Sequence, residues 1–154
     1  MPVTMEQVRA VLDPDEPNYQ QARRLGAEAL PHLRELVAAG EPMLASKATY
    51  LASLIDAEGS ADIINQAAQS PDAVLRVAAA GAARNLPPQE GSDILIRLVA
   101  DDDVGVRKVA LTSAGPAATA ELQARIRQAS QNDAAPRIRE LAAQTLERMR
   151  QSPP

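Results

Sequence analysis

The segment LRVAAAGAARNL, residues 75–86, is decisive for the fold because its pattern of apolar positions recurs along the chain. Equivalent segments are LASKATYLASLI (44–55), VRKVALTSAGPA (106–117) and IRELAAQTLERM (138–149), at successive offsets of 31, 31 and 32 residues. In each segment apolar residues stand at i, i+4, i+8 and i+11, the spacing of one face of an α-helix. We call these predicted helices the B helices. The shared positions are Leu44, Leu75, Val106 and Ile138; Ala48, Ala79, Ala110 and Ala142; Ala52, Ala83, Ala114 and Leu146; and Ile55, Leu86, Ala117 and Met149.

A second apolar pattern precedes each B helix and predicts an A helix before it. Its shared positions are Leu33, Ile64, Leu95 and Ile126, and then Leu36, Ala67, Leu98 and Ala129. Helix pairs that repeat every 20–50 residues indicate an α-solenoid, in which each pair buries its apolar face against the next. We therefore predict an all-α protein, a superhelix of about four A/B helix pairs with a period of about 31 residues. Its B helices should begin near residues 43, 73, 104 and 136.

The length of 154 residues fits a single domain. We predict one domain over residues 1–150, with a degenerate N-terminal cap over 1–26, about four repeats over 27–150 and a frayed tail over 151–154. In the cap, Thr4 and Gln7 have the spacing of a capping box, which predicts a helix over about residues 5–12. YQQARRLG (19–26) looks like a truncated B helix, and GSADI (59–63) and GSDIL (91–95) are predicted to start A helices.

The composition narrows the class of protein. There is no cysteine, which excludes disulfide bonds and thiolate metal sites. Phe and Trp are absent and alanine is abundant, which suits helices packed closely in layers. No apolar run approaches the roughly 20 residues that a membrane span needs. The N-terminus MPVTMEQVRAV also lacks the basic start and apolar core of a signal peptide, so we expect a cytoplasmic protein with no membrane partner.

The charge is spread unevenly along the chain. Residues 1–103 hold 8 Lys and Arg against 16 Asp and Glu, whereas residues 104–154 hold 8 against 4. The overall net charge is −4, and the polarity is mild. Counterion release on nucleic acid requires a basic field, and base stacking requires aromatic side chains. With only two tyrosines as aromatic residues, we expect no nucleic-acid partner.

The pattern D-x-x-V-R-x-x-A at residues 103–110, together with the helix pairs, resembles HEAT repeats. The short period and the Ala-rich B helices are most similar to the bacterial HEAT-like subgroup named after phycobilisome lyases. The resemblance covers about residues 17–150. The period of about 31 residues is shorter than the period of about 40 or more in ordinary HEAT repeats.

The run Asp101-Asp102-Asp103 could be a metal site or the start of a helix. Asp72 and Asp103 each stand three residues before the first apolar position of a B helix, where an N-cap carboxylate accepts free backbone N–H groups. No residues at EF-hand spacing accompany the run, so we favour a helix start, with Asp101 and Asp102 as solvated loop acids.

The acidic and basic columns of the repeat predict a ladder of ion pairs, as the resemblance to HEAT repeats also implies. The first unit lacks the arginine and the last unit lacks the acid, which is what a staggered ladder would leave. Such pairs contribute about 0.2–1 kcal/mol each when exposed. The expected pairs are Glu41–Arg76, Asp72–Arg107 and Asp103–Arg139.

Residues with catalytic chemistry are scarce. His32 is the sole histidine and stands at the start of an A helix, so a His-rich metal site or a Ser/His/Asp triad has too few parts. Asp13, Asp15 and Glu16 lie in a proline-punctuated loop, where solvation is the simpler interpretation. No phosphate-binding glycine loop is present. We expect no catalytic residue, no metal site and no cofactor.

What remains is the outward surface of the B helices, which lines the concave side in α-solenoids. The candidate partner-binding residues on this row are Tyr50, Val77, Arg84, Lys108 and Thr112. Tyr and Arg are typical interface anchors. Tyr50 admits two interpretations: an anchor beside the small Gly81, or a cover for the truncated first repeat.

We therefore expect a monomeric, non-enzymatic scaffold or adaptor that binds a protein or peptide on its concave B-helix face. The alternative is a subunit of a phycobilin-lyase-like system for chromophore attachment or detachment, which rests on the family resemblance alone. Absorbance after co-expression with a bilin and its carrier protein would separate the two.

Overall fold

The computed structural model describes residues 2–151, and its secondary structure over this range is helical, without strands. Two 3₁₀ segments, η1 (Arg23–Ala29) and η2 (Ala83–Asn85), accompany the α-helices. The α-helices are α1 (Met5–Leu12), α2 (Tyr19–Ala22), α3 (Leu30–Ala39), α4 (Pro42–Leu54), α5 (Ser60–Ala68), α6 (Ala73–Ala82), α7 (Pro88–Leu98), α8 (Val104–Ser113), α9 (Ala120–Asn132) and α10 (Pro136–Gln151). The all-α prediction is therefore confirmed.

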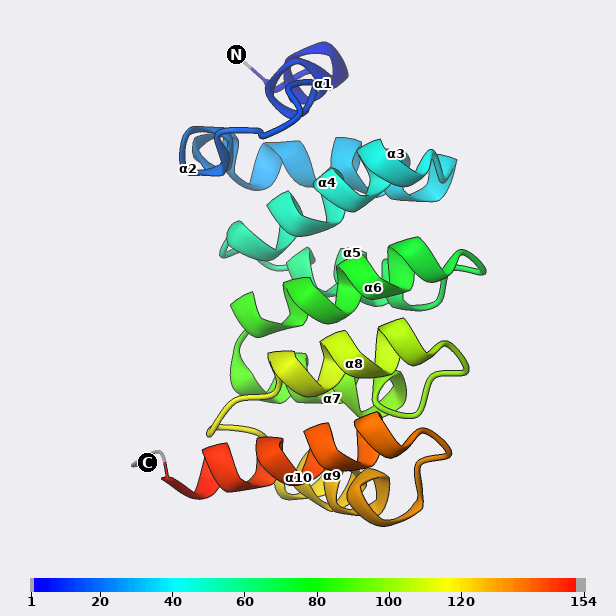
Figure 1. The fold of residues 1–154 in the computed structure, drawn as a ribbon. Helices are drawn as coiled ribbons and strands as arrows, with labels where there is room; N and C mark the ends of the chain where they lie inside the picture. The colour runs from blue at the N-terminus through cyan, green and yellow to red at the C-terminus, as the bar shows by residue number, and fades with distance from the viewer. Residues whose placement is uncertain (1, 152–154) are drawn as a thin grey trace.

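The helices from α3 onward are stacked in two layers (Figure 1). The helices α4, α6, α8 and α10 lie one below another in the front layer, and each contacts the next in chain order. The helices α3, α5, α7 and α9 form the second layer, and each packs on the front helix that follows it. These two layers correspond to the B and A helices of the sequence, and we keep those names.

The starts of the B helices are determined by local capping. They begin at Pro42, Ala73, Val104 and Pro136, within one residue of the positions that the sequence predicts. The Glu41 carboxylate accepts hydrogen bonds from the N–H groups of residues 43 and 44. Asp72 accepts from the N–H of residue 74 at 2.9 Å, and Asp103 from the N–H of residue 106 at 3.1 Å. The N-cap interpretation of these aspartates is confirmed.

The core contains most of the predicted columns. The alanines of one B-helix column are fully buried, and the two leucines and two isoleucines of the first A-helix column are fully or nearly fully buried. Leu44, Leu146, Met149 and Ala129 are only half-buried. Ala117 is exposed, and its assignment to the core is wrong because α8 ends at Ser113. The buried columns are Ala48, Ala79, Ala110 and Ala142, and Leu33, Ile64, Leu95 and Ile126.

Gly91 lies inside α7 and not at its start. The helix begins at Pro88, so the predicted start at GSDIL is wrong, whereas α5 does begin at Ser60 within GSADI. A Cβ atom at Gly91 would stand 2.6 Å from the carbonyl oxygen of Ala83 in η2. The absence of a side chain at Gly91 therefore lets α7 approach the backbone at the end of α6.

The N-terminal segment caps the first repeat. The helix α1 has the predicted capping box: the Thr4 hydroxyl accepts from the N–H of Gln7, and the Gln7 side chain accepts from the N–H of Thr4. His32 Nε2 donates to the carbonyl of Val3 at 2.8 Å, which ties this segment to α3. Only residues 19–22 of the predicted truncated helix are α-helical, because η1 follows with a kink at Gly26, φ 71°. Of the predicted tail, residues 152–154 lie outside the described residues.

Candidate binding surface

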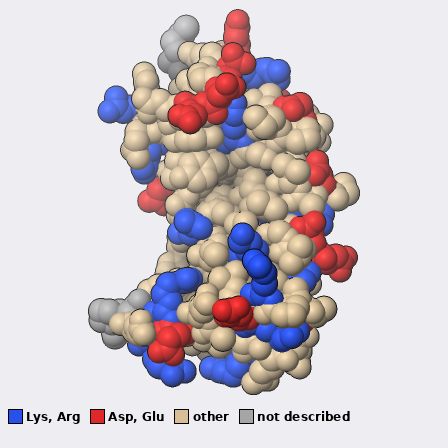
Figure 2. Space-filling view, in the orientation of Figure 1, with Lys and Arg blue, Asp and Glu red and all other residues tan. Residues whose placement is uncertain are grey.

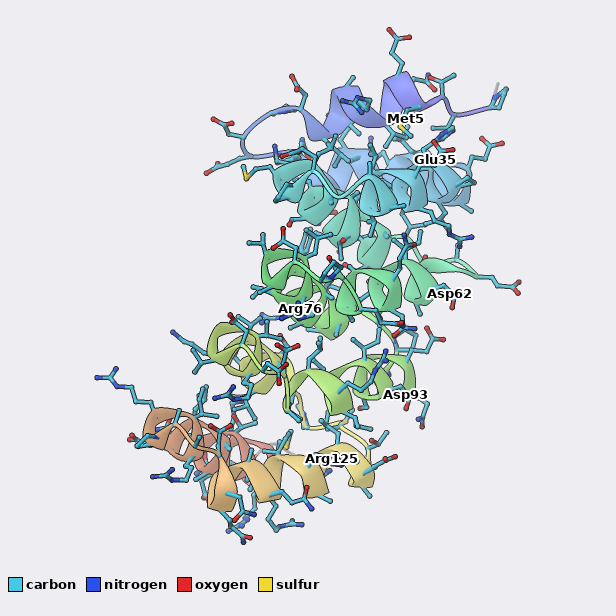
Figure 3. The ribbon with its side chains drawn as sticks, turned by 90° about the vertical axis from the view of Figure 1, so that its right-hand side faces the viewer. Met5, Glu35, Asp62, Arg76, Asp93 and Arg125 are labelled. Atoms are coloured by element: carbon cyan, nitrogen blue, oxygen red, sulfur yellow. The ribbon has the colours of Figure 1, made fainter. Side chains whose placement is uncertain are left out.

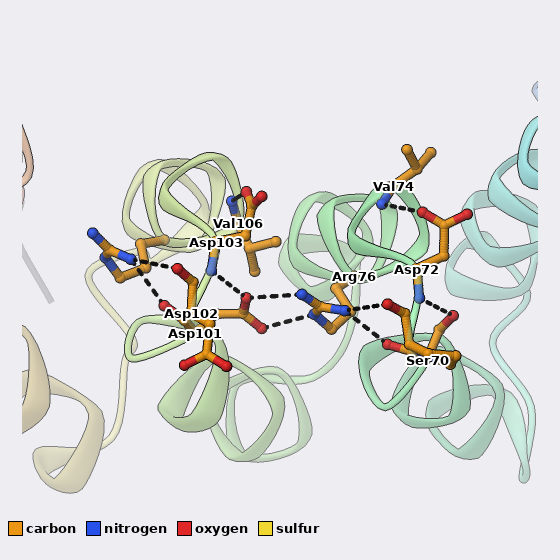
Figure 4. A network of polar contacts seen from close by, with 10 residues as sticks. Ser70, Asp72, Val74, Arg76, Asp101, Asp102, Asp103 and Val106 are labelled. Carbon is orange, nitrogen blue, oxygen red and sulfur yellow. Dashed lines mark hydrogen bonds and ion pairs between the residues drawn. The ribbon is translucent and has the colours of Figure 1, made fainter.

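An arginine of one repeat is held by an aspartate in the turn of the next repeat. Arg76 in α6 forms a two-pronged contact with Asp101, through Nε to Oδ2 at 2.9 Å and Nη2 to Oδ1 at 3.2 Å. Its Nη1 donates back to the carbonyls of Ser70 and Pro71 in its own turn (Figure 4). Arg76 thus joins two consecutive turns, and its hydrogen bonds to Asp101 are the main cause that raises the pKa of the guanidinium.

The same contact recurs one repeat later. Arg107 in α8 binds Asp133 through Nε to Oδ2 at 2.8 Å and Nη2 to Oδ1 at 3.1 Å, and its Nη1 donates to the carbonyls of Asp101 and Asp102. The side chains of Arg107 and Asp133 are only 14% and 7% exposed. The two hydrogen bonds are parallel and largely shielded from solvent. They hold the register between neighbouring repeats.

The ladder therefore exists, but the predicted partners are wrong. The expected pairs Glu41–Arg76, Asp72–Arg107 and Asp103–Arg139 do not form ion pairs in the described range. The three acids cap their own helices instead. Arg139 donates to the backbone carbonyl of Asp133.

A signal for the true partners is present in the sequence. Ser70, Asp101 and Asp133 share one column of the repeat, and each side chain accepts from the N–H group two residues later. Where the arginine is missing, the acid is missing too: the unit that has Ala45 in place of the arginine is followed by the unit that has Ser70 in place of the aspartate. Arginine and aspartate therefore occur together across the junction between repeats, but the aspartates belong to this column and not to the N-cap column used for the predicted ladder.

Removal of both members of the second rung tests this assignment. We expect Arg107→Ala and Asp133→Ala to show a coupling free energy of about 1 kcal/mol in a double-mutant cycle, because the two side chains are in contact. Free energies of unfolding from urea denaturation give the measurement. The matched cycle combines Arg107→Ala with Asp72→Ala, the pair predicted from the sequence, and should give coupling below about 0.5 kcal/mol. A larger coupling to Asp72 than to Asp133 would contradict the assignment.

The predicted partner-binding residues lie along neighbouring B helices and η2. Tyr50, Arg84, Lys108 and Thr112 are exposed, whereas Val77 is half-buried. Arg84 Nη2 donates to the Ser113 hydroxyl at 3.2 Å, and the Thr112 hydroxyl donates to the carbonyl of Val109. Arg84 and Thr112 are thus partly engaged inside the chain, which leaves Tyr50 and Lys108 as the more accessible members of the set.

Tyr50 contacts the N-terminal cap. Its ring meets the ring of Tyr19 edge to face, with centroids 4.7 Å apart and planes at 72°. Burial, and then the neighbouring Tyr50, raise the pKa of Tyr19. Tyr50 still remains 38% exposed. The structure thus shows the covering contact, and it also leaves Tyr50 partly open to solvent.

Within the described part of the chain, the large apolar side chains left exposed belong to the B helices. Among residues 2–151 they are Met43 and Tyr50 in α4, Val74 in α6 and Val104 in α8. Three of them, Met43, Val74 and Val104, are more than half exposed, at 63%, 53% and 53%. These three residues are not among the partner-binding residues predicted from the sequence. The sequence feature that could have indicated their exposure is an apolar residue in the first turn of a B helix that does not belong to a core column.

Exposed charged residues occur on both layers. In Figure 2, Asp and Glu are prominent at the N-terminal end and Lys and Arg in the lower half, although both kinds of charge occur in each half, and the centre of the face is largely uncharged. The A helices carry exposed charged residues at labelled positions (Figure 3): Glu35 in α3, Asp62 in α5, Asp93 in α7 and Arg125 in α9. We call the outward side of α4, α6, α8 and α10 the B-helix face.

Two open depressions lie beside this face. One, of about 710 Å³, is at the end of α4 and is lined by residues that include Arg23, Asp56, Glu58 and Glu90. The other, of about 730 Å³, lies between α8 and α10.

No cluster of His, Asp and Glu side chains within residues 2–151 has the arrangement of a metal site.

No protein-family model and no curated protein matches this sequence. Over the described part of the chain, no helix has both the length and the hydropathy that a membrane span requires.

Proposed function

We propose that this chain is a non-enzymatic interaction module: a HEAT-like α-solenoid whose B-helix face is concave and binds a protein or peptide partner. The sequence period of about 31 residues and the stacked A/B helix pairs support the architecture. The binding assignment is supported chiefly by one observation. The large apolar side chains that the described residues leave exposed, Met43, Tyr50, Val74 and Val104, all belong to B helices.

The physical argument is that exposed apolar surface gathered on one face favours a partner. Apolar side chains in water gain about 25 cal/mol for each Å² that a partner covers, and single scattered ones need no explanation. Here they recur on consecutive helices of one layer. The ladder residues Arg76, Arg107, Asp101 and Asp133 are engaged with one another at the edge of the stack, so they are not free for a ligand.

The first test replaces the exposed aliphatic side chains. We expect the triple variant Met43→Ser, Val74→Ser, Val104→Ser to remain folded, because the three side chains are exposed, and to lose at least tenfold in partner affinity. A tenfold loss corresponds to about 1.4 kcal/mol. Partners are captured from the native host with the wild-type chain, purified, and titrated against each variant by calorimetry.

The matched control alters the A helices instead. The variant Asp62→Ser, Asp93→Ser, Arg125→Ser changes three exposed residues on α5, α7 and α9 and should bind as the wild type does. Partners that lose affinity for the A-helix variant but not for the B-helix variant would refute the proposal.

A second test separates the two interpretations of Tyr50. We expect Tyr50→Ala to weaken binding about tenfold or more, as truncation of an aromatic anchor does, whereas Tyr19→Ala should weaken it less than twofold. Both changes remove the same ring contact, but only the first removes a side chain from the B-helix face. Circular dichroism verifies the fold of each variant. Equal losses would show that Tyr50 acts by holding the cap.

Asp102→Ala is the neutral control for both binding tests, because its side chain is exposed and its backbone carbonyl, not its carboxylate, holds Arg107. Asp101 is unsuitable as a control because it belongs to the ladder.

A further inference from the structure

The depression between α8 and α10 is lined by both apolar and cationic side chains. It has a volume of about 730 Å³, and Val104, Pro136, Ile138 and Leu141 contribute apolar surface to it. Val104 is 53% exposed, and Leu141 is half-buried. This volume falls in the range of about 300–1,000 Å³ that is typical of ligand sites, but the depression is open to one side like a groove. We call it the α8–α10 groove.

Two cations line the groove. Lys108 from α8 and Arg137 from α10 line the groove and are exposed, and neither makes an ion pair or side-chain hydrogen bond within residues 2–151. Glu140 is the acidic residue of the lining. The turns before α6 and α8 each place an N-cap aspartate beside the helix, whereas the corresponding residue before α10 is Ala135. Within the groove lining, two cations therefore stand against one carboxylate.

The exposed aliphatic side chains continue from the groove along the stack. Val104, Val74 and Met43 lie in the first turns of α8, α6 and α4, and these helices pack on one another in that order. Packed helices are about 8–10 Å apart. A polyproline II segment rises about 3.1 Å per residue with three residues per turn, so every third side chain recurs on one side at about 9.3 Å. An extended peptide laid across the B helices would thus present one side chain to each helix.

We propose that the α8–α10 groove binds an extended, acidic segment of a partner protein, with an aliphatic side chain against Val104 and Leu141 and a carboxylate between Lys108 and Arg137. This inference rests on the proposed function, because it identifies where on the B-helix face the partner binds and which chemistry it carries. Attraction between exposed charges is screened over about 8–10 Å at physiological salt, so binding should also weaken as salt is added.

The test selects ligands without knowledge of the native partner. A random-peptide display library is enriched on the immobilised wild-type chain, and a selected peptide is synthesised with a fluorescent label. We expect enriched sequences to carry Asp or Glu near Leu, Ile, Val or Pro. Fluorescence anisotropy should show affinity at least tenfold lower for Lys108→Glu/Arg137→Glu and for Val104→Ser than for the wild type.

The matched control keeps the change in net charge and moves it to the other layer. Arg125 and Arg127 lie exposed on α9, so Arg125→Glu/Arg127→Glu alters the chain by the same charge, and the peptide should bind it within twofold of the wild type. Circular dichroism verifies that each variant is folded.

Three results would overturn the inference. The first is a failure to enrich acidic peptides on the wild-type chain. The second is an equal loss of affinity in the groove and control charge variants. The third is a selected peptide that binds the Tyr50→Ala variant more weakly than the wild type but binds the groove variants as tightly. This result would overturn the inference about the groove but would still agree with binding on the B-helix face. Native partners whose affinity is unchanged by every B-helix substitution would instead refute the proposed function itself.

Discussion

The variant Ala110→Leu is expected to be less stable than the wild type by about 3 kcal/mol, the upper end of the usual cost of overpacking a core. Ala110 lies in the middle of α8, is 0% exposed, and belongs to the alanine column that is fully buried in each B helix. The helix packs against α6, α7 and α10, so a larger side chain cannot enter without separating helices on more than one side. Small side chains at this column set the close spacing of the layers.

Thermal unfolding measures this effect. A loss of about 3 kcal/mol should lower the Tm by roughly 6–12 °C for a chain of this size. The control Ala143→Leu places the same side chain at an exposed position of α10 and should change stability by less than about 0.5 kcal/mol. An unchanged midpoint for Ala110→Leu would mean that the alanine column does not determine the spacing of the helices.

The variant Gly91→Ala is expected to be destabilised by about 2 kcal/mol, although alanine favours a helix by about 1 kcal/mol over glycine. The added Cβ would stand 2.6 Å from the carbonyl oxygen of Ala83, a distance that real Cβ atoms do not tolerate. That oxygen belongs to backbone, so relief requires α7 to move away from η2 and α6. The free energy of unfolding in urea measures the cost.

Gly81→Ala provides the matched control, because Gly81 is also helical and the nearest heavy atom to its added Cβ, a methyl of Val109, is 3.9 Å away. We expect this change to be neutral or to stabilise the chain by about 0.5–1 kcal/mol. The two substitutions are chemically identical, so opposite signs would isolate the close approach at Gly91. Equal effects would contradict it.

The local features of this protein were accessible from its sequence. The B helices begin within one residue of the predicted positions, and the Thr4 capping box and the N-cap aspartates lie where their spacing placed them. Helix capping and the periodicity of apolar residues depend on interactions over three to eleven positions, so the order of residues alone contains the necessary information. The repeat strengthens the prediction of the helices because each column of residues recurs in several units.

The partners in the contacts between repeats were identified by the tertiary structure, because two acid columns of the sequence could have paired with the arginines. Arg107 binds Asp133 and not Asp72, because the Asp72 carboxylate caps its own helix. Asp133 lies in the turn of the following repeat, and its carboxylate faces back toward Arg107. The approach at Gly91 and the exposure of Val74 and Val104 likewise depend on how far apart and at what angle successive helices pack. A repeat pattern determines which face of a helix is buried, but helix spacing decides which side chains reach across to the next repeat and which remain in water.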